Sequence, residues 1–249
     1  MFDFSNKTVL ITGATRGIGK AIADLLYESG ANLILTGTKD SEINLLNEDI
    51  KAKGVLNKRF IQADFSDEIS IKKFLLYLNK IEIIDICINN AGVNKVNYFE
   101  DTSIEDFNWI QKINLELPYR IMKVVGPKML KNNYGRIVNI ASIWSVITRP
   151  GRSLYTTSKN ALVGLSKTLS VEWASNNVLV NTVSPGFTLT ELTKKTNTAE
   201  QLEEIENKIP AKRMAEPVEI ARVVAFLCSD QNTYLTGQNI AVDGGFTNV

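Results

Sequence analysis

Tyr155 and Lys159 are the residues of this chain whose types and spacing could move a proton. They lie four positions apart, and on a helix this spacing places the phenol and the ammonium on one face. A free phenol has a pKa of about 10, and lowering it to about 7 requires roughly 4 kcal/mol, which a cation about 4 Å away at a partly screened site supplies. The pair could therefore act as a general acid or base in a cleft, although the same spacing occurs by chance on many helices.

A glycine-rich turn follows the first predicted strand, Thr8–Ile11. Residues 12–19 (TGATRGIG) lead into apolar residues at helical spacing that continue as far as Gly30. Glycines let the backbone approach a pyrophosphate, and the following helix supplies oriented N–H groups and positive potential. The order of strand, turn and helix favours a dinucleotide site. A tight turn that merely packs the helix against the strand is the alternative.

The end of the second predicted strand, residues 32–36, favours NADP over NAD. In NAD sites an acidic residue about 20 positions after the glycines binds the ribose 2′-hydroxyl. Here the strand ends in Thr36 and continues into Thr38 and Lys39, while Arg16 lies inside the glycine turn. Hydroxyl and cationic groups therefore gather where a 2′-phosphate would lie. Lys39 could also be an ordinary solvated loop charge.

Strands and helices alternate along the rest of the chain. We expect strands over residues 57–62, 83–88, 136–141, 179–183 and 239–242, and helices over residues 42–53, 68–78, 103–131, 153–174 and 217–228. This alternation predicts a single α/β domain spanning residues 1–249, a doubly wound (Rossmann) parallel sheet of about seven strands with helices on both faces. The polar segment at about 189–213 is expected to form a substrate lid.

Polar residues end several predicted strands, at the edge where doubly wound sheets bind ligands. Asn90 closely follows one strand, Ser142 another and Asp64 a third. Asn114 falls in the middle of the predicted helix at 103–131, where asparagine is unfavourable. It is therefore either a tolerated polar residue or one placed for a purpose.

The composition excludes several classes of protein. A net charge of +1 argues against a general nucleic-acid or membrane-surface binder, and no apolar run approaches the roughly 20 residues of a membrane span. The absence of histidine removes serine–histidine triads and histidine-ligated zinc, and the two cysteines lack metal-site spacing, so no metal is expected. The first residues lack a charged-then-apolar signal, so we expect a cytoplasmic protein.

Taken together, the chain resembles the short-chain dehydrogenase/reductase family over essentially its whole length. The matching pieces are residues 12–19, Asp64, residues 89–92, Asn114, Ser142, Tyr155 with Lys159, Pro185 with Gly186, and residues 236–238 and 243–245. Within the family, the sequence pattern is most similar to that of the bacterial branch of 3-oxoacyl-carrier-protein reductases and sugar-acid or polyol dehydrogenases. The resemblance implies hydride transfer between NADP(H) and a ketone or secondary alcohol.

The resemblance also implies a catalytic role for four residues. Tyr155 would protonate the carbonyl oxygen, and Lys159 would lower the pKa of Tyr155 and hold the nicotinamide ribose. Ser142 would hydrogen-bond the substrate oxygen, and Asn114 would anchor a water relay to Lys159. Asn114 could instead be a structural residue that bonds local backbone.

The same resemblance assigns the cofactor contacts. Asp64 and Phe65 would contact the adenine, Asn90, Ala91 and Gly92 the adenosine ribose, and Thr188 the carboxamide. The full predicted set is Gly13, Thr15, Arg16, Gly17, Ile18, Gly19, Thr38, Lys39, Asp64, Phe65, Asn90, Ala91, Gly92, Tyr155, Lys159, Pro185, Gly186, Thr188 and Thr190.

The substrate prediction rests on the loop between Ser142 and Tyr155, which must pass beside the reacting carbon. Arg149 and Arg152 could grip a carboxylate or phosphate by forked hydrogen bonds, and Trp144 offers a flat apolar face. Lys95, with Ser142 and Tyr155, could face the same cleft. These residues predict a small anionic, polyhydroxylated carbonyl compound such as a sugar acid. The arginines could instead be solvated or serve a subunit interface.

Two other functions stay open. The main alternative is a 3-oxoacyl-carrier-protein reductase, whose relatives carry arginines on the two long helices to dock the acidic carrier. Pro127 and Val171 stand at the corresponding places here, although Lys128 could compensate. A regulatory protein that binds NADP without turnover is less favoured, because a mere binder needs no proton donor.

The resemblance further implies a homotetramer, with a dimer as the fallback. The long helices at 103–131 and 153–174 would form its interfaces. Their apolar residues beyond the needs of one core are Trp109, Val124, Leu165, Leu169 and Trp173.

Overall fold

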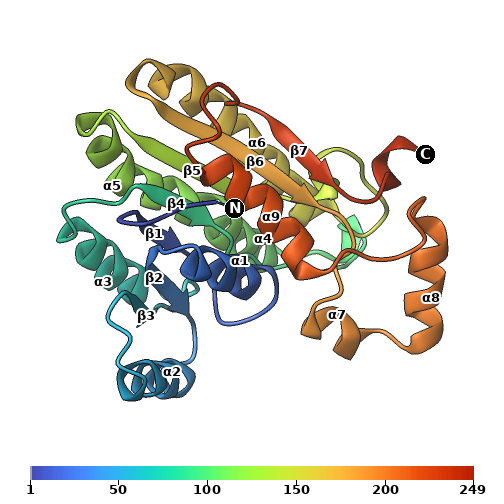
Figure 1. Ribbon diagram of the computed structural model, residues 1–249. Helices are drawn as coiled ribbons and strands as arrows, with labels where there is room; N and C mark the ends of the chain where they lie inside the picture. Colours follow the sequence, from blue (N-terminus) through green and yellow to red (C-terminus); the bar gives the residue numbers. More distant parts are fainter. Residues whose placement is uncertain (1) are drawn as a thin grey trace.

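Seven parallel strands form one sheet in the order β3-β2-β1-β4-β5-β6-β7, in a computed structural model that describes residues 2–249 and every side chain among them but that of Thr196 (Figure 1). The strands are β1 (Thr8–Ile11), β2 (Asn32–Gly37), β3 (Lys58–Gln62), β4 (Ile86–Asn89), β5 (Gly135–Ile140), β6 (Val178–Pro185) and β7 (Asn239–Val242). The chain order reverses between β1 and β4, which is where doubly wound sheets bind ligands. The predicted seven-stranded Rossmann sheet is confirmed.

Helices cover both faces of this sheet. The α-helices are α1 (Gly17–Glu28), α2 (Asp40–Ala52), α3 (Glu68–Asn79), α4 (Ile104–Gln111), α5 (Leu117–Lys131), α6 (Ser153–Trp173), α7 (Glu191–Thr196), α8 (Ala199–Lys208) and α9 (Pro217–Cys228). Helices α1 and α9 pack on one face, in front of the sheet in Figure 1, and α3, α5 and α6 pack on the other. The chain is therefore a three-layer α/β/α domain.

Alternate residues of the central strands serve two separate cores. In β1, Val9 and Ile11 pack with Ile22 of α1, whereas Leu10 packs with Phe74 of α3. Both faces of such strands are buried, which is why they are continuous apolar runs in the sequence. In β4, burial raises the pKa of the Cys87 thiol to about 12, so this cysteine is an inert core residue.

The predicted bounds hold to within a few residues, with two informative differences. Strand β4 begins at Ile86 rather than residue 83, because Ile83 is exposed in the turn before the strand. The helix predicted over 103–131 is not uniform. A π-helical segment, η2 (Lys112–Glu116), separates α4 from α5 and contains Asn114.

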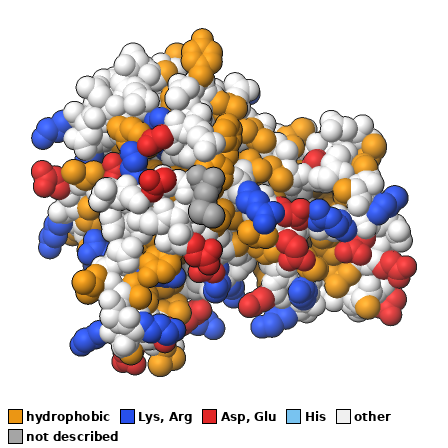
Figure 2. All heavy atoms as spheres, in the orientation of Figure 1, with side chains coloured by type: hydrophobic (Ala, Val, Ile, Leu, Met, Phe, Trp, Pro, Cys, Tyr) orange, Lys and Arg blue, Asp and Glu red, His pale blue; other side chains and the backbone are white. Residues whose placement is uncertain are grey.

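The predicted lid segment forms two helices, α7 and α8, which stand away from the sheet at the right of Figure 1. Its ends are held by backbone hydrogen bonds from Leu189 N to Ala215 O and from Ala211 N to Gly244 O. Acidic and basic side chains are interspersed over the face of the molecule shown in Figure 2, with no broad area of one charge. None of the helices in the described part of the chain has the length and hydrophobicity of a membrane span.

Candidate active site

The predicted proton-transfer residues come together at the carboxyl edge of the sheet. Tyr155 and Lys159 lie on one face of α6, and Ser142 closely follows β5. The Ser142 hydroxyl lies close enough to the Tyr155 phenol to lower its pKa. The Lys159 ammonium lies 5.5 Å from the centroid of the Tyr155 ring and donates to the carbonyl oxygen of Ile140 at 2.8 Å. Two of the four predicted catalytic residues, Ser142 and Lys159, thus lie around the half-buried phenol of a third, Tyr155.

The charges around the phenol differ from those that the sequence suggested. Burial raises the pKa of Tyr155, while its hydrogen bond with Ser142 and the positive charge of Arg152 partly offset this rise. Burial also lowers the pKa of Lys159 to about 8. Ser142 and Arg152 are therefore the groups that favour the phenolate here, and the effect expected of Lys159 on Tyr155 stays a prediction.

Asn114 is fully buried and bridges three parts of the fold. Its Oδ1 accepts from the Val93 N–H at 2.8 Å, and its Nδ2 donates to Val93 O at 2.9 Å and to the Ser158 hydroxyl at 3.0 Å. A Cβ placed on Gly92 would lie 3.4 Å from both Asn114 Oδ1 and Lys159 Nζ. Because π-helical turns often occur at functional sites, we interpret Asn114 as placed rather than tolerated. The water relay stays a prediction.

The glycine turn is tied to three strands by side chains that sequence reasoning had not assigned this role. Thr12 Oγ1 accepts from the N–H groups of Asn90 and Ala91, each at 3.0 Å. Asn90 Nδ2 donates to Thr12 O and Gly13 O at 2.9 Å, and Gly13 N donates to Thr36 Oγ1 at 3.0 Å. The Asn90 amide therefore shapes the turn, and its contact with the ribose stays a prediction. No local pattern could reveal this, since the partners lie 23 to 79 residues apart.

The turn fits the phosphates of a dinucleotide. Gly13 and Gly17 have φ values of +64° and +56°, which side chains rarely allow. Arg16 is the N-cap of α1, yet no side chain caps the helix and its first turn contains no acidic residue. The first N–H groups of α1 are thus available to an anion, and the helix dipole favours negative charge there.

The adenosine end of the site carries exposed positive charge. Arg16, Thr38 and Lys39 are all exposed, and among the described residues neither Arg16 nor Lys39 is paired with a carboxylate. Thr15 lies against the end of β2, where a Cβ on Gly37 would collide with its methyl group. This arrangement suits an additional phosphate near the ribose.

The two residues predicted to contact the adenine both have partners within the protein. Asp64 accepts hydrogen bonds from the Ser66 N–H at 2.8 Å and from its hydroxyl at 2.6 Å. Phe65 is buried and its ring packs on Phe74, with centroids 5.5 Å apart. The Phe65 side chain therefore belongs to the core, because burial of a large apolar ring is favourable. The adenine contacts of Asp64 and Phe65 stay a prediction.

The segment after β6 joins the base of the lid to the glycine turn. A Cβ on Gly186 would lie 2.7 Å from Asp243 Cα, so Pro185 and Gly186 pack closely against the end of β7. Thr188 Oγ1 donates to Gly186 O at 3.1 Å. Thr190 caps α7, and its methyl lies 3.4 Å from where a Cβ on Gly17 would be. Thr190 and the glycine turn thus meet, whereas Ile18 packs partly against the core. Their contacts with the cofactor stay a prediction.

Two guanidinium groups stack on one indole beside Tyr155. Arg149 Cζ and Arg152 Cζ lie 5.1 and 5.4 Å from the centroid of the buried Trp144 ring. Neither arginine pairs with a carboxylate among the described residues, and Arg152 Nε is buried without a hydrogen-bond partner. Phe187 packs edge-on against Trp144 and continues to Phe246, an aromatic wall that the sequence did not reveal.

Lys95 does not join this cluster. Its ammonium forms an ion pair with the Asp106 carboxylate at 2.6 Å, in the first turn of α4. Lys95 is thus paired with a carboxylate in this structure, and its contact with the substrate stays a prediction.

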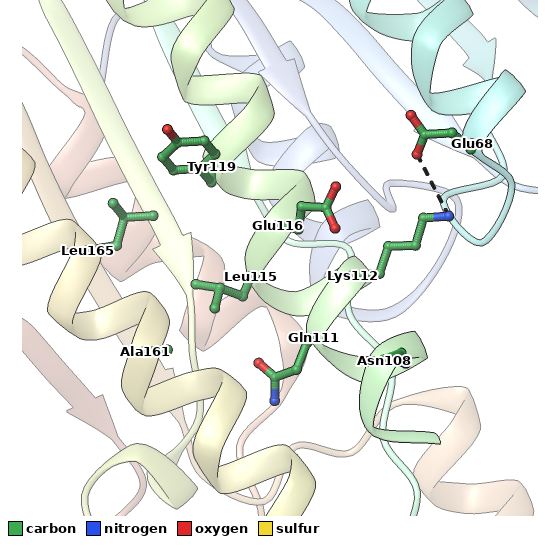
Figure 3. A pocket seen from close by; sticks show the side chains of 9 residues that line it. All are labelled: Glu68, Asn108, Gln111, Lys112, Leu115, Glu116, Tyr119, Ala161 and Leu165. Atoms are coloured by element: carbon green, nitrogen blue, oxygen red, sulfur yellow. Dashed lines mark ion pairs between the residues drawn. The ribbon is translucent and has the colours of Figure 1, made fainter. Parts of the chain in front are cut away.

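A surface pocket of about 700 Å³ lies away from these residues, between η2, the start of α5, and α6 (Figure 3). In Figure 3 Leu115 projects toward Ala161 and Leu165 of α6, while Lys112 pairs with Glu68 at the other side, with Nζ and Oε2 3.8 Å apart. None of the four predicted catalytic residues lines it. This pocket is therefore not the catalytic cleft.

Comparisons with known proteins agree with this geometry. A family model described as enoyl-(acyl carrier protein) reductase matches residues 13–247. A 3-oxoacyl-[acyl-carrier-protein] reductase of Rickettsia conorii is 38% identical over 245 residues, which cover 98% of each chain. A structure from Beutenbergia cavernae, assigned as an NAD(P)-dependent gluconate 5-dehydrogenase with bound NADP, is 32% identical, with a TM-score of 0.91 and coverage of 100% of this chain and 99% of that one.

A second solved structure contains both the cofactor and a small acid. It is a gluconate 5-dehydrogenase of Burkholderia cenocepacia in complex with NADP and tartrate, 26% identical, with a TM-score of 0.90 and coverage of 100% of this chain and 98% of that one. The matches span nearly the full length of these proteins. Together with the Ser142, Tyr155 and Lys159 cluster, they show that this chain belongs to the short-chain dehydrogenase/reductase family and is an oxidoreductase of alcohol and ketone groups.

Proposed function

We propose that this enzyme transfers a hydride between NADP(H) and the ketone or secondary alcohol of a small, polar, anionic substrate of the sugar-acid type. The observation that carries the proposal is the pair of arginines on Trp144, which have no carboxylate partner among the described residues. Of the two, Arg152 lies close enough for its charge to act on the Tyr155 phenol. The direct test is NADPH oxidation with a panel of keto-sugar acids, nucleotide-linked sugars, neutral ketones and acyl thioesters. Turnover confined to neutral ketones would contradict it.

The residues of the cluster supply the chemistry that an arriving hydride demands. NADPH, when bound, provides the hydride, and a negative charge develops on the substrate oxygen. The Ser142 hydroxyl can hydrogen-bond that oxygen, and Tyr155 can give it a proton. Lys159 would orient the nicotinamide ribose, while Asn114 fixes the backbone next to Gly92 and the position of α6 through Ser158. In the oxidation direction the same phenol accepts the proton.

The anionic group of the substrate would satisfy the arginine pair. Two like charges on one indole repel each other. Burial lowers the pKa of Arg152, and the charge of Arg149 lowers it further. A carboxylate or phosphate between them would relieve this repulsion and could accept forked hydrogen bonds from both guanidinium groups. The apolar faces of Trp144 and Phe187 would pack against the carbon skeleton. The tartrate bound in the related gluconate 5-dehydrogenase is an acid of this kind.

Replacing both arginines by glutamine should raise KM much more for an anionic substrate than for a neutral one of equal size. Each charge-assisted hydrogen bond contributes roughly 1.5–3 kcal/mol, so loss of one corresponds to about a 10- to 150-fold increase. Steady-state kinetics with a keto-hexonate and its primary amide would measure this, because the two differ only in charge. Equal losses for both compounds would mean that Arg149 and Arg152 are structural.

We propose a preference for NADP(H) because Arg16 and Lys39 are exposed at the adenosine end and Thr36 stands where NAD sites carry an acid. Thr36 is itself committed to Gly13. The Arg16→Ala/Lys39→Ala double variant should bind NADPH roughly 10- to 150-fold more weakly, with NADH little changed. Fluorescence titration with both cofactors measures the difference. Equal affinity of the wild-type protein for NADPH and NADH would refute the preference.

The lid is also a proposal. Segment 189–213 begins beside the glycine turn through Thr190 and ends against the C-terminal residues through Ala211 and Gly244. A segment fixed at both ends and projecting between them can close over a bound cofactor and substrate.

Reduction of an acyl-carrier thioester is the second candidate, favoured by the 38% identity to a 3-oxoacyl-[acyl-carrier-protein] reductase. Pro127 and Val171 offer no charge to an acidic carrier. The expectation that Lys128 could compensate is wrong, because its ammonium donates to the carbonyl oxygens of Leu78, Asn79 and Ile81 at the end of α3. Efficient turnover of an acyl-carrier thioester would nevertheless establish this function.

We further propose a homotetramer built on the helical face that includes the pocket of Figure 3. Val171 is 82% exposed and Tyr119 48% exposed, and Leu115 and Leu165 line the pocket. The earlier list of interface residues needs revision, because Val124, Leu165, Leu169 and Trp173 each pack partly against the core. Only Trp109 of that list is classed among the exposed apolar side chains.

Mass measurement in solution should give about four times the 27.7 kDa of one chain. The Val171→Glu variant places a charge in the proposed apolar contact without touching the core and should shift the distribution toward smaller species. An exposed site far from this face, such as Leu56→Glu, serves as the control, because Leu56 is 97% exposed in the loop before β3. A monomeric wild-type protein would refute the assembly, and a dimer would reduce it to one interface.

A further inference from the structure

Arg152 occupies an unusual place between the proposed anion site and the proton donor. It is the N-cap of α6, and its carbonyl oxygen accepts from the Thr156 N–H at 2.8 Å. Tyr155 follows three positions later, a spacing at which helical side chains are neighbours. The guanidinium stacks on the Trp144 ring, and the backbone N–H of Trp144 donates to the Ser142 hydroxyl at 3.3 Å. Arg152 is thus part of one contiguous cluster with the reacting groups.

The Arg152 guanidinium has one N–H group that lacks a hydrogen-bond acceptor. Its Nε is buried and has no hydrogen-bond partner, although buried polar groups are nearly always paired. A substrate carboxylate is an acceptor of matching chemistry. Arg149 is exposed and lacks such an orphaned atom among the described side chains, so the two arginines are not equivalent.

Few other charges act on Tyr155. Lys159 lies 5.5 Å from the ring centroid but donates to Ile140 O, and Arg149 lies on the same indole as Arg152. No carboxylate among the described residues perturbs the phenol. Burial raises the pKa of Tyr155, and the Arg152 charge acts in the opposite direction. A guanidinium stays protonated throughout the range in which enzymes work, so its charge changes only when an anion pairs with it.

Resting on the anionic substrate proposed above, we infer that Arg152 is a positioning residue that couples binding of the substrate's anionic group to proton transfer by Tyr155. An anion on Arg152 cancels the positive charge that favours the phenolate, so the phenol keeps its proton until the hydride arrives. The proton then passes from Tyr155 Oη to the substrate oxygen as the C–H bond forms. The phenolate left behind regains a proton from solvent. A neutral substrate leaves the Arg152 charge in place and gains no such protection.

The pH dependence of kcat for reduction tests this coupling without any variant. Reduction needs the protonated phenol, so kcat falls as pH rises through the pKa of Tyr155 in the substrate complex. The pH at which kcat begins to fall, here called the limb of the profile, should be higher for a keto-hexonate than for its primary amide. At pH values above both of these points, each pH unit of separation between the two profiles corresponds to about a tenfold difference in kcat. Lys159, with a pKa of about 8, contributes equally to both profiles. Coincident limbs would overturn the inference.

Variants separate this role from a merely structural one. Arg152→Gln should move the limb for the amide upward, to where the keto-hexonate limb lies, and so abolish the difference between the two substrates. Arg152→Lys should restore a difference. Arg149→Gln should raise KM for the keto-hexonate while the limb for the amide stays in place. If Arg149→Gln moved that limb as far as Arg152→Gln does, the assignment to Arg152 would be wrong.

A spectroscopic measurement gives the same answer without turnover. The tyrosinate absorbance of the wild-type protein minus that of Tyr155→Phe should titrate at higher pH once Arg152 is replaced by glutamine. An unchanged difference titration would refute the coupling. Failure of the proposed function has another signature, namely no preference in KM for the keto-hexonate over its amide, and that result would overturn both proposals.

Discussion

Tyr155→Phe is expected to lower turnover about 10²- to 10⁴-fold, the contribution typical of a general acid–base group, while NADPH binding stays close to wild type. The substitution removes one hydroxyl and its hydrogen bond with Ser142. It keeps the ring that faces the Lys159 ammonium, and therefore the packing at the start of α6. Single-turnover kinetics together with NADPH titration would separate loss of chemistry from loss of binding.

Tyr134→Phe is the matched control. Its hydroxyl donates to Asp230 at 2.8 Å, and it precedes β5 at the edge of the sheet opposite Tyr155. Loss of this exposed hydrogen bond should leave turnover unchanged. Near-wild-type turnover in Tyr155→Phe with NADPH binding intact would remove Tyr155 from the mechanism.

Gly19→Ala should abolish NADPH binding at ordinary concentrations, with a loss in affinity on the order of 100-fold. A Cβ at this position would fall well inside van der Waals distance of Gly13 O and Asn90 Nδ2. Neither atom can retreat, because the Asn90 amide holds the turn through Thr12 O and Gly13 O. Overpacking of such a site costs about 1–3 kcal/mol and occasionally more.

Gly164→Ala controls for a general effect of adding a methyl group to a helix. Gly164 lies in α6 with no atom within 4 Å of a placed Cβ. Alanine is a better helix former by roughly 0.5–1 kcal/mol, so this variant should melt slightly higher and bind NADPH normally. Wild-type NADPH affinity in Gly19→Ala would show that the glycine turn is not the pyrophosphate site.

The parts of the fold that the sequence predicted well are those determined by local patterns. Thr8–Ile11 is a strand, and the glycine turn opens α1, because β-branched runs, glycines and helical spacing act over a few residues. The order of these elements implied a parallel sheet. The sequence could predict that Ser142 and Tyr155 lie close together, because Ser142 follows a strand and Tyr155 begins a helix at the same edge of the sheet.

The sequence could not show where a distant partner decides what a side chain does. Lys95 forms an ion pair with Asp106, Lys128 donates hydrogen bonds to carbonyl oxygens at the end of α3, and the Phe65 ring packs on Phe74. Each of these side chains has the right type for the role first given to it. Charge and size are visible in a sequence, but availability depends on neighbours that only the folded chain supplies.

The π-helical turn η2 has a consequence for how this scaffold can change. A π turn holds one residue more than the α-helical turn it replaces, so α4 and α5 are out of phase by about 100°, the angle of one α-helical residue. Deleting a single residue from η2 would give a smooth, better-bonded helix, yet it would rotate Asn114 away from Val93 and Ser158. Stability and catalysis thus favour different lengths of the same segment. A relative that kept the cofactor site but lost catalysis could therefore lack this extra residue. Its helix would be one residue shorter at the position of η2.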